Sequence, residues 1–443
     1  MSYSETIEFL YGHLPMFQRI GPAAYKNSLD NSLKLDGIYH HPHSCFKTVH
    51  VAGTNGKGSV SHMIAAVLQA AGYKTGLYTS PHLKDFRERI RVNGQMIAEE
   101  IVDYWVNDFR AKNKLWKIDA SFFELTVAMA FDFFKQEKVD IAVVEVGLGG
   151  RLDSTNIIEP EVSVITNIGF DHTSLLGDSL EKIAIEKAGI IKRGVPVVVG
   201  ITQPEIRHLF EERAKSAKAP LFFADSEYLT DYSMLSLDGK QVFQVRNKTG
   251  IVYPDLKIDL LGLYQRKNLP AVLKTIGLLV EKGWKISRED IYAGLSAVKS
   301  RTGLMGRWQV IGANPMVVCD TGHNPDGIRE VTDQISAMAY RRLHMVLGFV
   351  KDKDIAGILR LLPPDAGYYF TKANLPRALD EKILIGMANE AGLKGESYES
   401  VNEAFKAALQ NADCEDLVFV GGSTFVVAEI LQDFICKNLE MKK

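Results

Sequence analysis

The chain has 443 residues, 46% hydrophobic and 24% charged, which is the balance of a globular protein with enough apolar mass for two or three domains. Lys and Arg total 52 against 54 Asp and Glu, and this near-neutral balance argues against sequence-independent binding to nucleic acid. No apolar run approaches the ~20 residues of a membrane span, no signal-peptide core opens the chain, and the four scattered cysteines lack metal-site spacing. We therefore expect a cytoplasmic protein without membrane or nucleic-acid partners.

The first half of the chain alternates apolar segments of strand length with helical patterns. The expected strands are residues 47–53, 74–80, 140–147, 162–169 and 195–200. The expected helices are residues 57–71, 121–136 and 179–191. This alternation predicts an α/β fold with a mainly parallel sheet that helices cover on both faces.

The alternating pattern restarts near residue 315. Four further strands are expected at residues 315–320, 343–349, 367–373 and 416–422, and a helix follows the last of them. Residues 296–309 carry few periodic apolar positions, so we place a domain boundary near residue 298. The prediction is a larger domain at 1–297 and a smaller, Rossmann-like α/β domain at 298–443.

The segment VHVAGTNGKGSV (49–60) is the most informative in the chain. An apolar strand ends, a glycine-rich turn follows, and a helical pattern begins. Glycines can take positive φ and turn backbone N–H groups toward an anion, and Lys57 adds a mobile positive charge. The alternative is a glycine-rich tight turn with a surface lysine. The pattern favours a phosphate-binding loop made of Gly53, Thr54, Asn55, Gly56, Lys57, Gly58 and Ser59.

The loop departs from the common form G-x-x-x-x-G-K-[ST]. Val51 stands in place of the first glycine, and Gly58 stands where a metal-binding hydroxyl is usual. Ser59 follows one position later, so the loop pattern leaves open which hydroxyl would approach a magnesium ion.

Six segments, in this order along the chain, carry a family resemblance. They are GTNGKGS (53–59), TSPHL (79–83), VVEVGLGGRLDSTN (143–156), DHTSLLG (171–177), EKAGIIK (186–192) and DTGHNPDG (320–327). Together they resemble the folylpolyglutamate synthase/dihydrofolate synthase family of the Mur ligase superfamily, over a region from about residue 15 to the C-terminal helix. The resemblance implies a Mur-ligase-type P-loop ATPase domain followed by the smaller Rossmann-like domain.

Three residues are expected to bind metal. Glu145 ends an apolar strand, where P-loop enzymes place a magnesium-binding carboxylate, although a capped strand end has the same pattern. Ser80 and His172 alone would be a turn serine and a surface histidine. The resemblance implies that Ser80, Glu145 and His172 coordinate two Mg²⁺ ions and that His172 takes part in catalysis. K⁺ is a further candidate cofactor.

Lys187 would be a solvated helix lysine on its pattern alone. The resemblance implies that carbon dioxide carbamylates it, which converts the amine into an anion suited to a site near metal ions. The resemblance also implies ATP contacts in both domains. The corresponding positions are Asn268, Arg307, Asp320 and His323, although Asp320 and His323 equally suit a capped turn and Arg307 a linker charge.

A folate-binding region is implied near the segment TSPHL. An aromatic ring with a cation suits a flat heterocycle that carries a carboxylate tail. Phe86 as a core residue and Arg89 as a surface ion pair would explain those two positions equally well. Phe122 and Phe123 are candidates for the same pocket, although a buried helix explains both equally well. The implied folate-binding residues are Pro81, His82, Leu83, Phe86, Arg89, Phe123 and Asp153.

The implied reaction is ATP-driven amide formation on a folate. The substrate carboxylate attacks the γ-phosphate to form an acyl phosphate, and the amine of L-glutamate displaces the phosphate. We prefer a bifunctional enzyme that also joins glutamate to dihydropteroate, with a monofunctional folylpolyglutamate synthase as the alternative. A cell-wall Mur ligase and a nucleotide-binding switch are remoter alternatives. The resemblance suggests a monomer whose domains close on the substrates.

Overall fold

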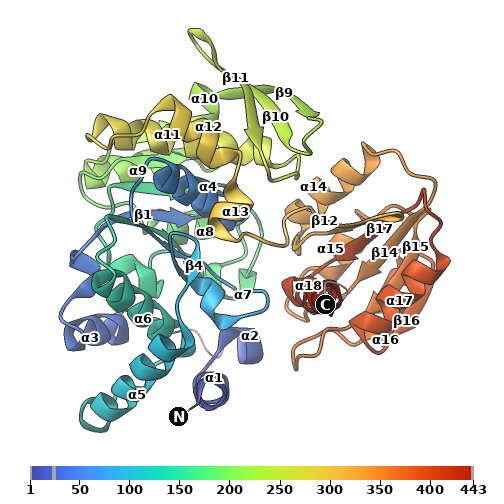
Figure 1. The fold of residues 1–443 in the computed structure, drawn as a ribbon, viewed down its shortest axis with the longest axis horizontal. Coiled ribbons are helices and arrows are strands. Elements are labelled where there is room, and N and C mark those ends of the chain that lie inside the picture. Colours follow the sequence, from blue (N-terminus) through green and yellow to red (C-terminus); the bar gives the residue numbers. More distant parts are fainter. Residues whose placement is uncertain (1, 22–25, 441–443) are drawn as a thin grey trace. The chain divides into compact units, whose positions relative to one another are not determined.

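The computed structural model describes residues 2–21 and 26–440. Within these residues the strands form three sheets, of eight, three and six strands (Figure 1). The chain divides into two units. Unit 1 comprises Met1–Gly169, Thr173–Asp259 and Tyr264–Leu304, and unit 2 comprises Phe170–His172, Leu260–Leu263 and Met305–Lys443. The predicted α/β class with mostly parallel sheets is confirmed.

The eight-stranded sheet of unit 1 has the order β4-β3-β2-β5-β1-β6-β7-β8. Its strands are β1 (Lys47–Ala52), β2 (Thr75–Tyr78), β3 (Ile90–Val92), β4 (Gln95–Met96), β5 (Ile141–Glu145), β6 (Val162–Ile165), β7 (Val197–Val199) and β8 (Leu221–Phe223). All pairs from β2 to β8 are parallel, and β3 and β4 add an antiparallel edge. Val51 of β1 lies opposite Glu145 of β5 and Val164 of β6, so β1 is central.

Helices cover both faces of this sheet, which explains why its central strands are buried along nearly their whole length. The longer helices are α1 (Tyr3–Gly12), α3 (Asp30–Ile38), α4 (Lys57–Ala70), α5 (Glu99–Trp116), α6 (Phe122–Gln136), α8 (Leu180–Ala188), α9 (Arg207–Ala217), α11 (Gln265–Glu281) and α12 (Arg288–Leu295). Helices α11 and α12 pack on α4. Helices α1, α3, α5 and α6 share an aromatic-rich core with strands β2, β3 and β5.

Short helical segments complete unit 1. They are α2 (Phe17–Ile20), α7 (Thr173–Leu176), α10 (Ala224–Glu227), α13 (Val298–Thr302) and the 3₁₀ turns η2 (Pro42–Ser44), η3 (Phe86–Arg89) and η4 (Ser154–Ile157). Helix α13 lies after the predicted boundary near residue 298, yet it belongs to unit 1. The Thr302 hydroxyl lies 2.7 Å from Nδ1 of His62 on α4, and both side chains are buried. The last division between the units falls between Leu304 and Met305.

A three-stranded antiparallel sheet in unit 1 was not anticipated from the sequence. It consists of β9 (Leu229–Leu235), β10 (Gln241–Asn247) and β11 (Gly250–Ile258). Much of β11 is exposed, so this strand carries no continuous apolar run of the kind that marks a buried strand. Short hairpin connections pair the three strands instead.

The sheet of unit 2 has the order β12-β13-β17-β14-β15-β16. Its strands are β12 (Gln309–Ala313), β13 (Met316–Cys319), β14 (Leu343–Leu347), β15 (Gly367–Thr371), β16 (Gly395–Tyr398) and β17 (Leu417–Gly421), and its helices are α14 (Pro325–Ser336), α15 (Ile355–Leu359), α16 (Glu381–Glu390), α17 (Val401–Asn411) and α18 (Thr424–Glu440). The four expected strands are present. The sequence did not indicate the edge strands β12 and β16, which are partly exposed and lack an apolar run.

The sequence bears on two features, membrane-spanning helices and cysteine pairing. In the described part of the chain, no helix is both long and apolar enough to cross a membrane. Cys45, Cys319 and Cys414 are free thiols.

Candidate functional site

The loop between β1 and α4 has a backbone that only glycine accommodates at two positions. Gly53 has φ of 147° and Gly56 has φ of 83°. A Cβ atom at Gly53 would collide with the hydroxyl of Thr166, and one at Gly56 would collide with the side-chain amide of Asn268. The loop therefore combines left-handed backbone with close approach of neighbouring side chains, as an anion-binding turn at a helix N-terminus requires.

The segment that follows β6 holds this loop in place. The Thr54 N–H donates to the carbonyl of Asn167 at 2.9 Å, and the Thr54 hydroxyl donates to the carbonyl of Gly169 at 3.1 Å. The Asn55 N–H donates to the side chain of Asn167 at 3.0 Å, and the Thr166 hydroxyl donates to the Asn55 carbonyl at 2.5 Å. These bonds fix the conformation of the loop within the fold.

Two lysine amines converge on one carbonyl of the loop. Lys57, the first residue of α4, donates from Nζ to the carbonyls of Gly53 and Thr54, each at 3.1 Å. Lys187 on α8 donates to the same Gly53 carbonyl at 2.8 Å, and it is only 4% exposed. The interpretation of Lys187 as a solvated lysine is therefore wrong, because α8 packs its amine against the loop. The ammonium group of Lys57 at a turn rich in N–H donors makes an electropositive position.

A chain of polar side chains joins the first turn of α4 to α11. Gly58 and Ser59 are buried, and the Ser59 hydroxyl accepts a hydrogen bond of 3.2 Å from Gln265. Gln265 in turn accepts a bond of 2.8 Å from Asn268. Asn268, expected as a nucleotide contact, thus lies beside Gly56 of the loop, and Gln265 is a linking residue that no sequence pattern indicated.

Ser80 and Glu145 lie together at the carboxyl edge of the sheet. Glu145 ends β5 and is 4% exposed, and its Oε2 accepts a hydrogen bond of 3.2 Å from the Ser80 N–H. The two residues meet because β2 and β5 are adjacent parallel strands, whose carboxyl ends share one edge. Carboxylate and hydroxyl oxygens are ligands that suit Mg²⁺.

A polar and aromatic cluster surrounds the segment after β2. Arg89 is 3% exposed, donates from Nε to Nδ1 of His82 at 2.7 Å, and lies over the ring of Phe122. Arg89 is therefore no surface ion pair. Phe86 is buried in the same core. Burial and then the charge of Arg89 hold the pKa of His82 well below its usual value, so His82 is neutral.

The hydrogen bonds of His82 define its tautomer. Because the guanidinium Nε of Arg89 can only donate, Nδ1 of His82 accepts and Nε2 carries the hydrogen. This nitrogen lies 3.2 Å from the hydroxyl of Tyr11, whose ring stacks on the imidazole. Tyr11 belongs to α1, distant in sequence, and no local pattern indicated that it joins this cluster.

The other implied folate residues lie in the segment after β2, on α6 and in the turn that follows β5. Pro81 is exposed, and the Leu83 N–H donates to Glu88 at 2.8 Å. The ring of Phe123 packs closely on Gly147, so a Cβ atom there would collide with the ring. Asp153 is buried and accepts bonds from Leu148, at 2.9 Å, and from the N–H and hydroxyl of Thr155, so it organises the turn from residue 147 to 156. Burial raises the pKa of Asp153, and these hydrogen bonds lower it in part.

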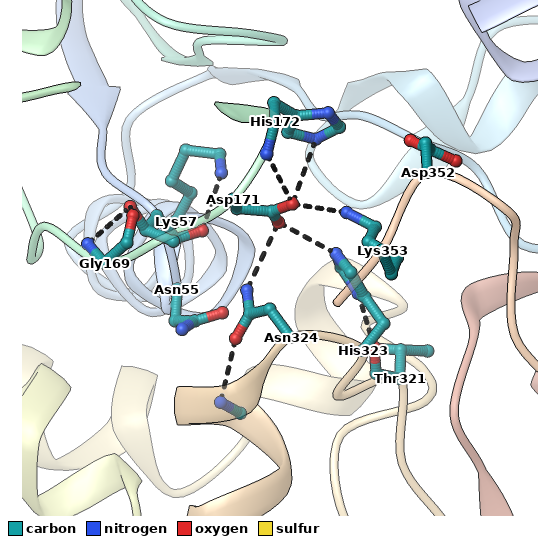
Figure 2. A network of polar contacts seen from close by, with 12 residues as sticks. Asn55, Lys57, Gly169, Asp171, His172, Thr321, His323, Asn324, Asp352 and Lys353 are labelled. Carbon is teal, nitrogen blue, oxygen red and sulfur yellow. Dashed lines mark hydrogen bonds and ion pairs between the residues drawn. The ribbon is translucent and has the colours of Figure 1, made fainter. Parts of the chain in front are cut away.

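In unit 2, Asp171 is the centre of a polar network (Figure 2). Its carboxylate forms an ion pair with Lys353 and accepts bonds of 3.2 Å from Asn324 and 3.2 Å from Nε2 of His323. Burial acts to raise the pKa of Asp171, but His172, His323 and Lys353 together hold it well below its usual value. The motif DHTSLLG contains Asp171, although only its neighbour His172 was singled out from the sequence.

His172 adopts a left-handed backbone, with φ of 50°, and its N–H donates to Asp171 at 2.8 Å. Residues 170–172 are grouped with unit 2, whereas Ser80 and Glu145 belong to unit 1. The three predicted metal ligands are thus divided between the two units.

Asp320 and Arg307 join the start of unit 2 to its sheet. Asp320 follows β13, and its two oxygens accept from the N–H groups of Trp308 at 2.7 Å and Gly322 at 2.8 Å. Arg307 donates to the hydroxyl of Thr321. Asp320 is 3% exposed, and its carboxylate caps the turn, which is the alternative that its sequence pattern left open. The ring of His323 reaches Asp171.

Comparisons with known proteins agree with this architecture. Residues 51–276 match the Mur ligase middle domain, and residues 306–424 match the Mur ligase glutamate ligase domain. A Bacillus subtilis protein named dihydrofolate synthase/folylpolyglutamate synthase is 32% identical over 437 residues, which cover 97% of this chain and 98% of that protein. A Haloferax volcanii protein named probable bifunctional folylpolyglutamate synthase/dihydropteroate synthase is 34% identical, and the chain spans 50% of its length.

A solved structure shows the same likeness in three dimensions. The structure of Escherichia coli FolC in complex with DHPP and ADP superposes with a TM-score of 0.85 at 29% identity, covering 99% of each chain. The matched domains, the sequence similarity over nearly the whole chain and the fold all indicate the same family. The chain belongs to the folylpolyglutamate synthase/dihydrofolate synthase family of the Mur ligases.

Proposed function

We propose that this protein is an ATP-dependent ligase that attaches L-glutamate to folates through an acyl-phosphate intermediate. The observation that carries the proposal is the loop at residues 53–59, where Lys57 and Lys187 converge on one carbonyl. Family membership supports it, because the relatives of nearly equal length are named as synthases of dihydrofolate and folylpolyglutamate.

The loop addresses the main physical obstacle of this reaction. A substrate carboxylate must approach a triphosphate although both are anions. Backbone N–H groups at the start of α4 and the ammonium of Lys57 offset this repulsion and the charge that develops in the transition state. Lys57 now donates to two loop carbonyls, and we infer that it exchanges them for phosphate oxygens when nucleotide binds.

The residues at the sheet edge fit magnesium. Glu145 is a buried carboxylate beside Ser80, and we propose that these two oxygen donors, with His172 of unit 2, hold two Mg²⁺ ions. Bound magnesium would neutralise charge on the phosphates. We propose carbamylation of Lys187, whose amine is fixed at the loop by its bond to Gly53.

The cluster of Tyr11, His82, Phe86, Arg89 and Phe122 supports a folate site in unit 1. It offers aromatic surface, a buried guanidinium and a neutral imidazole, which together suit a planar heterocycle with an anionic tail.

We assign the remaining predicted contacts to ATP. They are Asn268 in unit 1 and Arg307, Asp320 and His323 in unit 2. Asn268 is supported by its position against Gly56, and Asp320 by its role in shaping the turn that carries His323. We extend the proposal to a monomer that acts in the cytoplasm.

Replacement of Lys57 tests the proposal. The variant Lys57→Ala should lower the rate of glutamate- and folate-dependent ADP release by about 10²–10³-fold, because one preorganised charge on the transferring phosphoryl group is lost. The matched control is Lys47→Ala, at the other end of β1, whose side chain is 66% exposed. This control should keep wild-type activity.

Two outcomes would contradict the proposal. Full activity of Lys57→Ala would remove the loop from the chemistry. Turnover of ATP at the same rate with and without folate and glutamate would instead indicate a nucleotide-binding switch, and dependence on a muramic acid acceptor would indicate a cell-wall ligase.

A further inference from the structure

A histidine- and aspartate-containing turn lies between α3 and β1 in unit 1. Nδ1 of His41 lies 2.7 Å from one carboxylate oxygen of Asp36, and Nδ1 of His43 lies 2.6 Å from the other. The potential ligand atoms of all three residues lie within 4.8 Å of one another. Two imidazoles and one carboxylate therefore converge on a single position.

The local backbone builds this arrangement from residues close in sequence. Asp36 lies in the last turn of α3, and the chain then reverses through His40 and His41, which both have left-handed backbone with φ of 60° and 49°. Pro42 begins the turn η2 and directs His43 back toward Asp36. The spacing D-x-x-x-x-H-x-H thus brings the side chains of Asp36, His41 and His43 together.

Hydrogen bonds hold the turn from several sides. The His41 N–H donates to the Asp36 carbonyl at 2.8 Å, and the Ser44 hydroxyl donates to the His41 carbonyl at 2.8 Å. Lys135 of α6 donates to the carbonyls of Tyr39 and His40 at 3.3 and 3.2 Å. The cluster is preorganised, which lowers the cost of binding a ligand there.

The cluster is buried at its base and open at its rim. The side chain of Asp36 is 3% exposed, that of His43 is 23% exposed, and that of His41 is 66% exposed. An ion could enter from solvent beside His41 and meet the carboxylate beneath it. Solvent could supply the remaining ligands.

We propose that Asp36, His41 and His43 form a binding site for a divalent transition-metal ion of the Zn²⁺ class. Imidazole nitrogen and carboxylate oxygen are ligands of zinc and its neighbours, whereas Mg²⁺ prefers oxygen alone. On binding, each Nδ1 exchanges its hydrogen bond with Asp36 for a metal bond, the hydrogen of each ring lies on Nε2, and any excess imidazole proton passes to solvent.

This site is separate from the nucleotide loop. Residues 42–44 lie two residues before the start of β1, and the loop at residues 53–59 follows the other end of that strand. Six residues of strand separate them by about 20 Å. An ion here would connect the end of α3 to the entry of the central strand, and so would stabilise the fold without touching the reacting groups.

Cobalt and zinc titration of the full-length protein tests the proposal. Co²⁺ is the spectroscopic probe, and Zn²⁺ is then titrated in competition with a chromophoric chelator, both in excess Mg²⁺. We expect one equivalent of Co²⁺ to give visible bands that Zn²⁺ abolishes. His41→Ala and His43→Ala should each weaken Zn²⁺ binding by about 100-fold or more, because each removes a direct ligand.

The matched control is His40→Ala, which removes the exposed neighbouring histidine that lies outside the cluster. It should retain wild-type Zn²⁺ affinity, and so should Glu145→Gln, which alters the proposed magnesium site. Zn²⁺ should raise the melting temperature of wild type and His40→Ala but not of His41→Ala, whose mutated side chain is mostly exposed.

Three results would overturn the proposal. The first is that the wild type binds no Zn²⁺. The second is that His41→Ala and His43→Ala bind Zn²⁺ as tightly as the wild type. The third is that His40→Ala loses as much Zn²⁺ affinity as His41→Ala and His43→Ala. The first two would leave the cluster as a hydrogen-bonded turn, and the third would indicate nonspecific binding to exposed histidine.

Discussion

At the scale of single residues, the Gly53 carbonyl is the most informative atom of the candidate site. Lys57 and Lys187 reach it from α4 and α8, helices far apart in the chain. The position of Lys57 followed from the loop pattern. The position of Lys187 did not, because nothing in a helical stretch such as LEKIAIEKA tells a buried lysine from a solvated one. The family resemblance pointed to it, and the packing of α8 brings it to the loop.

Carbamylation of Lys187 is testable by isotope labelling. In ¹³C-bicarbonate the wild-type protein should show a carbamate carbon signal that Lys187→Ala lacks, and Lys187→Ala should lose about 10²-fold or more of its ligase rate. Lys182→Ala, which removes an exposed lysine of the same helix, should retain both the signal and the rate. A fully active Lys187→Ala variant would refute a catalytic role.

At the scale of elements, strand β1 connects the nucleotide loop to the turn that follows β5. His50 of β1 is fully buried, and its Nε2 lies 2.9 Å from the hydroxyl of Thr155. That hydroxyl donates to Asp153, so it accepts from His50, whose hydrogen must lie on Nε2. Burial, and then the charge of Lys192, lowers the pKa of His50 to about 3.

This lowered pKa predicts an acid-dependent loss of stability. The unfolded chain binds a proton at His50 below its ordinary pKa of 6.5, and the folded chain only below about 3. The contribution of neutral, buried His50 to the free energy of unfolding is therefore complete above pH 6.5. It declines as the pH falls from 6.5 toward about 3. At pH 5 the loss is about 2 kcal/mol. Denaturant unfolding at pH 7 and pH 5 should show this extra loss in wild type.

The variant His50→Gln isolates the effect. Glutamine keeps an N–H donor for Thr155 but does not titrate, so its stability should fall less between pH 7 and pH 5. His208→Gln replaces an exposed histidine and should follow the wild type. Equal acid dependence in His50→Gln and wild type would contradict the prediction.

At the scale of the whole molecule, the two α/β units account for a ligase better than for a simple nucleotide switch. Unit 1 carries the loop, the acidic strand end and the aromatic cluster, and unit 2 carries its own polar network around Asp171. A switch would explain the loop and Glu145 but not a second α/β unit with polar groups at its strand ends.

The acceptor range is a property of the whole enzyme. With ATP and L-glutamate, the purified protein should glutamylate both dihydropteroate and a reduced folate, because both reactions use the same phosphoryl chemistry. Product masses after each incubation check this. Glutamylation of the folate alone would indicate a monofunctional folylpolyglutamate synthase.

The sequence by itself determined the α/β class, the central strands and the nucleotide loop, because these depend on local patterns: apolar runs, glycines that must take positive φ, and a helix start at Lys57. It did not indicate the antiparallel sheet β9–β11 or the edge strands β12 and β16, whose exposed residues leave little apolar signal.

Only the tertiary structure decided which side chains meet. The contacts join residues far apart in the chain: Gln265 lies beside Ser59, Tyr11 stacks on His82, and Lys353 pairs with Asp171. The physical reason is that such contacts join residues through the fold, by burial and directional hydrogen bonds, and no periodicity along the chain encodes the partner.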